Sequence, residues 1–225
     1  MSLCVIPARG GSKRIPRKNI RPFHGRPIIG WSIEVARDSG LFGRIVVSTD
    51  DPEIAEIASA AGAEVPFVRP ADLATDQAAT VPVIAQAVAA LAVAPDTPVC
   101  CLYATAPFLR ADDLAEGLRL LQTGASYAMA VTRFDYPIQR ALRRGADGAV
   151  AMMDPALMQV RSQDLEPAWH DAGQFYWARA ATWAAEVPVF GPGAHGVALP
   201  SHRVVDIDTE DDWTRAEALF TVLDR

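Results

Sequence analysis

Over roughly its first half, the chain alternates short apolar runs with longer stretches of helical periodicity. The short runs are too brief for helices and predict strands at residues 3–6, 44–50, 63–68 and 99–103. The longer stretches carry helix caps and stops and predict helices at residues 27–39, 51–62, 80–91 and 112–121. Strands that are apolar nearly throughout and separated by helices are typical of a parallel sheet covered on both faces. The sequence therefore predicts a three-layer α/β fold with a mostly parallel sheet.

The second half departs from this alternation. Shorter strands with irregular connections are expected at residues 126–132, 148–153 and 174–177. We interpret residues 126–178 as a sheet extension and protruding arm inside a single domain of residues 1–225, because a chain of this length can build one large core. A strand at residues 203–208 and an amphipathic closing helix at residues 210–223 complete the expected fold.

The first expected strand runs directly into a loop that holds Gly10, Gly11 and many cations. Glycines allow close backbone approach, and bare amides beside cations suit a phosphate chain. The first 26 residues contain no carboxylate and carry the cations Arg9, Lys13, Arg14, Arg17, Lys18, Arg21 and Arg26. The whole chain has a formal net charge of −6, which argues against general nucleic-acid binding and localises an anion site to one face. A solvated basic turn is the alternative interpretation.

Three of the expected strands end in residues that can form a binding site, at residues 8–9, 48–50 and 104–105. Parallel strands deliver their carboxyl ends to one edge of the sheet, which is where open α/β sheets bind ligands. We therefore expect these residues to meet, and their convergence favours a phosphate site over a solvated turn.

Asp206 and Asp208 stand two residues apart at the end of an expected strand, so both should lie on one face of it. Mg²⁺ favours one or two carboxylates together with substrate phosphates, which makes this pair complementary to a basic phosphate loop. The alternative is that Asp208 and Thr209 cap the helix that follows.

Residues 161–165 and 170–177 mix polar and aromatic side chains closely, unlike a core strand or a solvent loop. This mixture favours recognition of a hydroxyl-rich ligand, and a subunit interface is the alternative, because aromatics and Arg are enriched there too. His170 is a possible general base, although a lone His beside Asp is more often structural. The loop at residues 69–76 can be an ordinary solvated connection.

Cys4, Cys100 and Cys101 fall inside expected strands and have neither disulfide nor zinc spacing, so we expect core thiols. Nothing resembles a signal peptide, and no apolar stretch approaches the roughly 18 residues that span a bilayer. A cytoplasmic protein without membrane contact is expected.

Several motifs resemble the acylneuraminate (CMP-sialic acid) cytidylyltransferase family, in order and at the expected separations. These motifs are residues 6–13, 18–19, 47–50, 69–76 and 206–209. Residues 103–108, 134–142, 161–165 and 170–177 resemble more narrowly the pseudaminic acid branch of that family. The sialic acid enzymes usually show Gln-Pro-Thr-Ser-Pro in place of residues 103–107 and Arg-Pro-Asn-Gly in place of residues 170–173. These departures disfavour N-acetylneuraminate as the substrate.

The resemblance implies a Rossmann-like nucleotidyltransferase fold with a dimerisation arm, in a homodimer. It implies that CTP and pseudaminic acid, a nine-carbon 2-keto acid sugar, give CMP-pseudaminic acid and diphosphate with Mg²⁺ as cofactor. The residues implied in CTP binding are Ala8, Arg9, Gly10, Gly11, Ser12, Lys18, Asn19, Arg69, Ala78 and Thr80. Arg9, Lys18, Asp206 and Asp208 are implied in catalysis, the two aspartates as metal ligands. For the sugar we expect Tyr103, Arg161, Gln163, Asp171 and Gln174, some of them acting across a dimer interface.

Two alternatives to this function stay open. The sugar can instead be N-acetylneuraminic, legionaminic or 3-deoxy-manno-octulosonic acid. The chain can also be a non-catalytic nucleotide-binding or regulatory protein, although such a protein would be expected to lose Lys18 or the aspartate pair, and all three residues are present.

Overall fold

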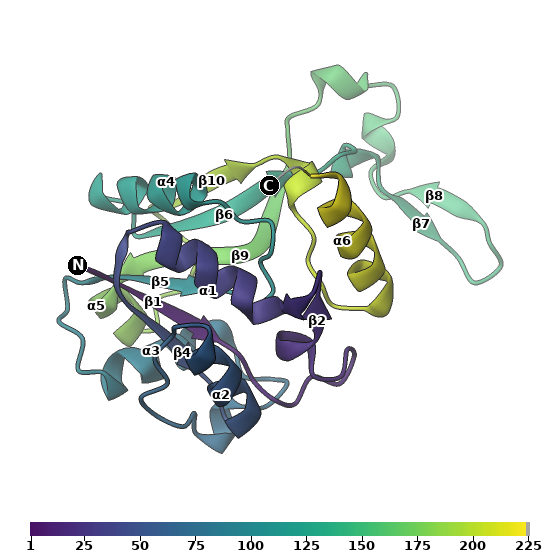
Figure 1. The fold of residues 1–225 in the computed structure, drawn as a ribbon. Coiled ribbons are helices and arrows are strands. Elements are labelled where there is room, and N and C mark those ends of the chain that lie inside the picture. The colour runs from purple at the N-terminus through teal and green to yellow at the C-terminus, as the bar shows by residue number, and fades with distance from the viewer. Residues whose placement is uncertain (224–225) are drawn as a thin grey trace.

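A twisted six-stranded sheet forms the centre of the computed structural model, which describes residues 1–223 (Figure 1). The strand order is β10-β6-β9-β5-β1-β4, and β9 is antiparallel to both of its neighbours while the other pairings are parallel. The strands are β1 Ser2–Pro7, β4 Phe42–Ser48, β5 Pro98–Leu102, β6 Tyr127–Arg133, β9 Trp169–Arg179 and β10 Ala194–Leu199. The mostly parallel α/β sheet expected from the sequence is confirmed.

Helices cover both faces of this sheet and make it the middle of three layers (Figure 1). One face packs against α1 Ile28–Asp38, α2 Pro52–Ala60 and α4 Ala111–Gln122, and the other against α3 Thr80–Ala90 and α5 Ala180–Ala184. The strands are buried on both sides, which is why their sequences are apolar nearly throughout.

The closing helix, α6 Glu210–Val222, belongs to a third apolar cluster beside the N-terminal loop. Trp213 and Ala216 of this helix join Ile15 and Phe23 of the loop, together with Val205 and Ile207. This cluster brings the N-terminal loop against the C-terminal segment, so that the basic loop and the aspartate pair become neighbours.

The helix ends follow the local signals in the sequence. Asp51 caps α2, its carboxylate accepting bonds from the amides of Glu53 and Ile54, and Pro52 occupies the first turn. Gly62 then takes a positive φ of 96° where the chain leaves the helix. Thr209 caps α6 in a reciprocal bond with Asp212, so Thr209 rather than Asp208 carries the capping role.

Two of the expected strands are absent within the described residues. Residues 63–68 form only isolated bridges, Val46 to Glu64 and Thr49 to Val68, because Pro66 interrupts the run. Residues 203–208 form no ladder either, because the place beside β6 is taken by β10, which lies earlier in the chain and was not expected from the sequence. After β10 a short 3₁₀ turn redirects the chain away from the sheet.

Residues 134–168, which we call the arm, project from the body between β6 and β9 (Figure 1). They hold the hairpin of β7 Leu142–Arg144 and β8 Val150–Met152. The region expected as extension and arm, residues 126–178, thus contains two strands of the main sheet, and only its middle projects. A dimerising role for the arm stays a prediction.

The remaining elements are short. A two-strand turn pairs β2 Pro22–Phe23 with β3 Arg26–Pro27. The 3₁₀ turns are Lys18–Ile20, Ala71–Leu73, Ile138–Arg140, Pro155–Leu157, Ser162–Asp164 and Ser201–Arg203. None of the helices in residues 1–223 combines the length and the hydropathy that a bilayer span requires.

Candidate active site

A cavity of about 490 Å³ opens at the carboxyl ends of β1 and β5, and we call it the edge pocket. Its wall combines the N-terminal loop, the first turn of α3 and the segment after β5. The lining residues are Pro7, Arg9, Ser12, Lys13, Arg14, Lys18, Asn19, Arg69, Asp76, Ala78, Thr80, Val83, Tyr103, Ala104, Thr105 and Asp208. The strand ends expected to converge therefore do meet at one edge.

Most residues implied in CTP binding lie on this wall. The edge pocket contains Arg9, Ser12, Lys18, Asn19, Arg69, Ala78 and Thr80. Ala8 is fully buried behind the wall, and Gly10 and Gly11 belong to the loop but do not line the cavity. Lys13, Arg14 and Asp76 were missing from the predicted site, although the charge of the loop was the signal that could have included the two cations.

Acidic residues at the start of α2 hold the N-terminal loop in place. The Gly10 amide donates to Oδ1 of Asp50 at 3.0 Å, and a Cβ on Gly10 would stand 2.5 Å from Oδ2 of Asp51. Arg17, at a positive φ of 57°, donates to both Asp51 and Glu53. The Arg17 hydrogen bond is the main reason that the pKa of Asp51 is lowered. Gly10 is therefore required by a close approach, whereas a Cβ on Gly11 would meet nothing within 4 Å.

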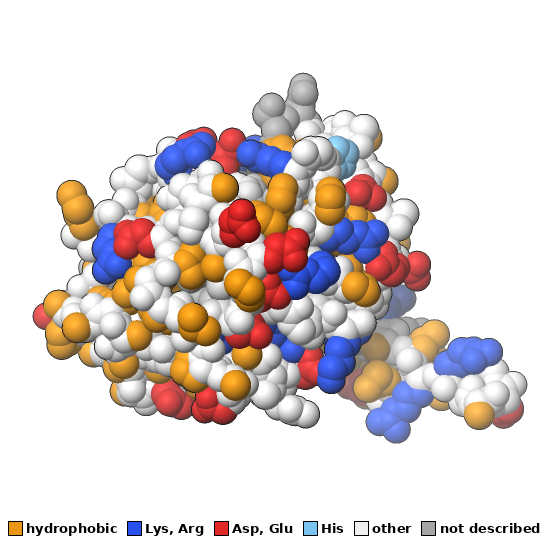
Figure 2. Space-filling view, turned by 60° about the horizontal axis from the view of Figure 1, so that its bottom comes forward, with side chains coloured by type: hydrophobic (Ala, Val, Ile, Leu, Met, Phe, Trp, Pro, Cys, Tyr) orange, Lys and Arg blue, Asp and Glu red, His pale blue; other side chains and the backbone are white. Residues whose placement is uncertain are grey.

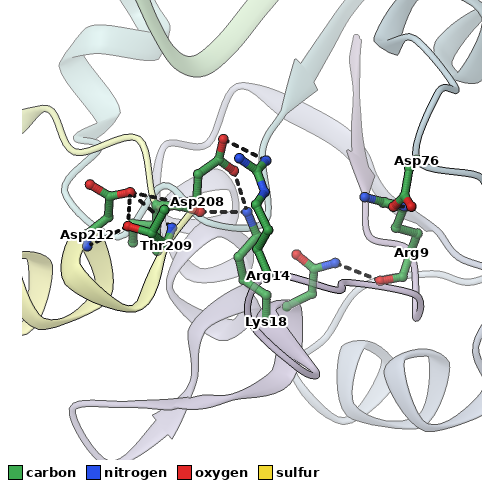
Figure 3. A network of polar contacts seen from close by, with 9 residues as sticks. Arg9, Arg14, Lys18, Asp76, Asp208, Thr209 and Asp212 are labelled. Carbon is green, nitrogen blue, oxygen red and sulfur yellow. Dashed lines mark hydrogen bonds and ion pairs between the residues drawn. The ribbon is translucent and has the colours of Figure 1, made fainter. Parts of the chain in front are cut away.

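Two carboxylates divide four cations of the edge pocket between them. Figure 3 shows three of these cations, Arg9 beside Asp76 and Arg14 and Lys18 beside Asp208. Asp76 pairs with Arg9 and with Lys13, whose Nζ lies 2.6 Å from Oδ2. Hydrogen bonds from Lys13 and then Arg9 lower the pKa of Asp76. Asp208 pairs with Arg14 at 2.8 Å and with Lys18 at 3.2 Å. The basic loop thus holds carboxylates in the positions where a phosphate chain would supply its oxygens.

The edge pocket is also lined by a buried guanidinium. Arg69 is 4% exposed, and it donates through Nε to Oγ of Ser48 at 3.1 Å and through Nη2 to the Ser48 carbonyl. Burial lowers the pKa of Arg69 to about 10, so the side chain remains charged near neutral pH. Asn19 fixes the loop by donating to the Arg9 carbonyl at 2.9 Å. Ala78 lines the edge pocket together with Arg69, and its small side chain leaves room for a flat ring. A ring with acceptor atoms suits the guanidinium.

Asp206 and Asp208 share a face although their segment is not a strand. Val205 comes before the pair and Ile207 lies between the two aspartates. Both apolar side chains are buried, so the two carboxylates lie on the side away from the core. Lys18 reaches this segment as well, donating to the Ile207 carbonyl at 2.6 Å. Burial first, and then the charge of Asp208, raise the pKa of Asp206.

This aspartate pair is chemically suited to a divalent cation but incomplete as a cage. A cation bound between two carboxylates offsets their mutual electrostatic repulsion. Within residues 1–223 no group of three or more His, Cys, Asp or Glu side chains is arranged to hold a metal ion. Mg²⁺ at Asp206 and Asp208 would therefore depend on substrate phosphates for further ligands.

The residues expected to recognise a sugar divide into two groups. Tyr103 lines the edge pocket, and its amide donates to the Gln174 carbonyl at 2.8 Å. Asp171 acts electrostatically on Asp206, and Gln174 is buried with its Nε2 donating to the Arg203 carbonyl at 3.0 Å.

Arg161 and Gln163 lie elsewhere, on the arm. Both are exposed, and Arg161 pairs locally with Asp164 at 2.8 Å. His170 is exposed too, with Nδ1 2.9 Å from the Asp171 carbonyl, and it does not line the edge pocket. The edge pocket of one chain is therefore built without these three side chains.

The chain is similar to known cytidylyltransferases in sequence and in fold. A sequence profile of the family described as cytidylyltransferase matches residues 3–176. A pseudaminic acid cytidylyltransferase of Campylobacter jejuni is 45% identical, covering 98% of this chain and 97% of its own. A CMP-N,N'-diacetyllegionaminic acid synthase of Legionella pneumophila is 31% identical, covering 97% and 95%. The solved structure of a CMP:2-keto-3-deoxy-manno-octonic acid synthetase complexed with CTP has a similar fold, with a TM-score of 0.71 and 18% identity, covering 98% and 99%.

Proposed function

The chain belongs to the cytidylyltransferase family, and from that premise we propose that it transfers CMP from CTP to pseudaminic acid and releases diphosphate. The observation that carries this proposal is the 45% identity with a pseudaminic acid cytidylyltransferase over nearly the full length of both chains. The paired cations at the end of β1 support it, because a phosphate chain can replace the two carboxylates that hold them. The family resemblance predicted from sequence motifs is confirmed.

In this proposal the edge pocket binds CTP along its length. The triphosphate is bound by Arg9, Lys13 and Lys18, and the Ser12 hydroxyl donates to it. Before this, the ion pairs of Asp76 with Arg9 and Lys13 must break. Arg69 and the small residue Ala78 receive the cytosine ring. This division follows the clustering of the loop cations around Asp76 and Asp208 and the burial of Arg69 against Ser48.

The chemical step needs positioning and charge neutralisation more than covalent help from the protein. The anomeric 2-hydroxyl of the sugar loses its proton as its oxygen bonds to the α-phosphorus in line, the bond to the bridging oxygen breaks, and diphosphate leaves. Arg9 and Lys18 stabilise the charge that grows on the leaving group. Mg²⁺ held by Asp206 and Asp208 would neutralise phosphate charge and lower the pKa of the attacking hydroxyl.

We further propose that the arm packs against a second copy of the chain in a homodimer. Figure 2 shows the arm standing off the body with hydrophobic and basic side chains on it. Its exposed apolar residues include Tyr136, Ile138, Leu142, Val150, Met153 and Met158. A monomeric protein rarely leaves so many large apolar side chains in water. The proposed packing would also bring Arg161 and Gln163 to the edge pocket of the partner.

The cytoplasm is the proposed location. Cys4, Cys100 and Cys101 are free and buried, which fits a compartment that keeps thiols reduced. A fractionation experiment with antibodies against the native protein would test this.

The function is tested by incubating the purified protein with CTP, Mg²⁺ and a panel of sugars while diphosphate release is recorded. The panel contains pseudaminic, N,N'-diacetyllegionaminic, N-acetylneuraminic and 3-deoxy-manno-octulosonic acids. Pseudaminic acid is expected to be turned over with the highest kcat/KM. Turnover of another sugar acid without turnover of pseudaminic acid would overturn the proposal. N,N'-diacetyllegionaminic acid is the second candidate substrate, because the chain is 31% identical to the legionaminic acid enzyme. CTP binding by calorimetry without turnover of any sugar would instead favour a non-catalytic protein.

A further inference from the structure

Strand β9 contains an irregularity beside the aspartate pair. Asp171 lies opposite Val131 of β6, and Tyr176 lies opposite Met129. These two pairs are separated by two residues along β6 but by five along β9. The stretch between Asp171 and Tyr176 therefore bulges out of the ladder with β6. Such bulges re-aim side chains and are common next to active sites.

The bulge creates a contact that a regular strand forbids. In an unbroken strand, residues five positions apart are about 17 Å apart and on opposite faces. Here the Tyr176 hydroxyl donates to Oδ2 of Asp171. Oδ1 of the same carboxylate accepts from the Gly173 amide at 2.9 Å, at a glycine with a φ of 59°. Both oxygens of Asp171 are thus fixed by the local fold.

The fixed carboxylate faces the aspartate pair. A Cβ on Gly173 would stand 3.6 Å from the carboxyl carbon of Asp206, so the bulge lies directly against that residue. The charge of Asp171 contributes to the raised pKa of Asp206. Asp171 therefore lies near Asp206, on the acidic side of the site.

The other end of this arrangement reaches the nucleotide side of the edge pocket. Tyr176 is 5% exposed, and its ring centroid lies 5.5 Å from that of Tyr103. The Tyr103 hydroxyl lies 2.8 Å from Oγ1 of Thr80. Two hydrogen-bonded pairs, Thr80 with Tyr103 and Tyr176 with Asp171, are therefore linked by the contact between the two tyrosine rings. Burial raises the pKa of Tyr176, which keeps its hydroxyl protonated and able to donate.

We infer that Tyr176 is a positioning residue that fixes Asp171 as an acceptor for a hydroxyl or amide N–H of the sugar. A carboxylate has about four acceptor sites, and the Tyr176 and Gly173 donors occupy two of them. The sites that remain have fixed directions, so they favour the stereoisomer whose donors match and reject the one whose donors do not. This inference rests on the proposed function, and it assigns Tyr176 to the sugar side of the site.

The experiment compares Tyr176→Phe with Tyr127→Phe. Tyr127 is a matched control, because it is also buried, lies on the neighbouring strand β6 and donates one hydrogen bond, to the Val187 carbonyl at 2.9 Å. Tyr176→Phe is expected to raise the KM for the sugar about tenfold, as for a lost bond to a charged group, with the KM for CTP within about twofold. Tyr127→Phe should lower the thermal midpoint similarly and leave both KM values unchanged. Equal effects of the two substitutions on the sugar KM would overturn the inference.

A double-mutant cycle tests whether Tyr176 acts through Asp171. Asp171→Asn alone should raise the sugar KM at least as much as Tyr176→Phe, and adding Tyr176→Phe to it should raise the KM by less than about twofold more. Independent, multiplying effects would show that Tyr176 does not act through Asp171.

A measurement that needs no sugar separates this inference from the proposed function. If the wild-type protein turned over no member of the sugar panel, the proposed function would fail. Crystal structures of the variants would then decide the inference. The Asp171 carboxylate is expected to keep its orientation in Tyr127→Phe and to rotate away in Tyr176→Phe, and an unchanged carboxylate in Tyr176→Phe would overturn it.

Discussion

At the scale of single residues, the cations of the edge pocket are already neutralised by carboxylates from distant parts of the chain. Asp76 follows the loop after Arg69, and Asp208 comes from the segment before α6. A phosphate chain must displace these carboxylates before it can bind. The affinity for CTP therefore reflects a competition between internal and external anions.

We predict that Asp76→Asn lowers the KM for CTP by about threefold, because exposed ion pairs are weak but must be broken before the triphosphate binds. Steady-state kinetics at two salt concentrations would measure the change, which should be smaller at high salt. Asp72→Asn is the control, since Asp72 is exposed in the same loop and does not line the edge pocket. A higher KM in Asp76→Asn would mean that Asp76 assists binding.

We predict that the Asp206 carboxylate makes the stability of the protein depend on pH. Its pKa is raised in the folded protein, so its ionised form costs stability once the pH exceeds the ordinary aspartate pKa of 3.8. Asp206→Asn should therefore raise the thermal midpoint without substrate by roughly 1–2 °C at neutral pH, a small value because solvent screens the charge. The difference from wild type should shrink as the pH falls toward 4. A difference that stays constant between neutral pH and pH 4 would contradict the assignment.

At the scale of elements, the segment that carries the aspartate pair is held by a buried ion pair instead of a sheet ladder. Arg203 donates to both oxygens of Asp113, at 2.7 and 3.0 Å, near the start of α4. The side chains are 10% and 11% exposed. This contact and the third apolar cluster fix where residues 203–208 lie.

Asp113→Asn is expected to reduce the free energy of unfolding by about 3 kcal/mol, because it leaves a buried guanidinium without its anion. Urea unfolding would measure the loss. Glu116→Gln, on the same helix, removes an exposed pair with Arg119 and should leave the urea midpoint unchanged. Equal midpoints for the two variants would show that the Arg203 pair does not hold the segment.

At the scale of the whole molecule, the proposed homodimer bears on whether the site of one chain is complete. Arg161 lies on the arm and does not line the edge pocket of its own chain, while large apolar side chains of the arm face solvent. The proposed homodimer, in which each arm packs on the partner, would account for both observations.

Complementation tests this arrangement. Arg161→Ala and Lys18→Ala are each expected to reduce turnover at least tenfold. Mixing the two variants under conditions that exchange subunits should restore about a quarter of wild-type activity, because half of the dimers are mixed and each has one intact site. Leu142→Glu with Val150→Glu on the arm hairpin should give a monomer by light scattering. Mixtures that remain inactive, with the subunits shown to exchange, would mean that Arg161 does not act in the partner.

The sequence by itself determined most elements of the first half of the fold and the sheet edge at which the edge pocket lies, but it did not predict α5 or β10. Its apolar runs predict β1, β4 and β5 and their carboxyl-end convergence, because strand and helix periodicities are local properties. The glycine-bearing basic loop likewise predicts an anion site at that edge. The departures were residues 63–68, which Pro66 interrupts, and residues 203–208, where β10 occupies the place beside β6.

Only the tertiary structure decided which distant groups face one another. It set β9 antiparallel between β5 and β6, bulged this strand so that Tyr176 meets Asp171, and placed Asp76 and Asp208 against the cations of the loop. The physical reason is that these contacts join residues far apart in the chain or out of strand register. Their geometry follows from how the layers pack, and the periodicity of a sequence does not encode it.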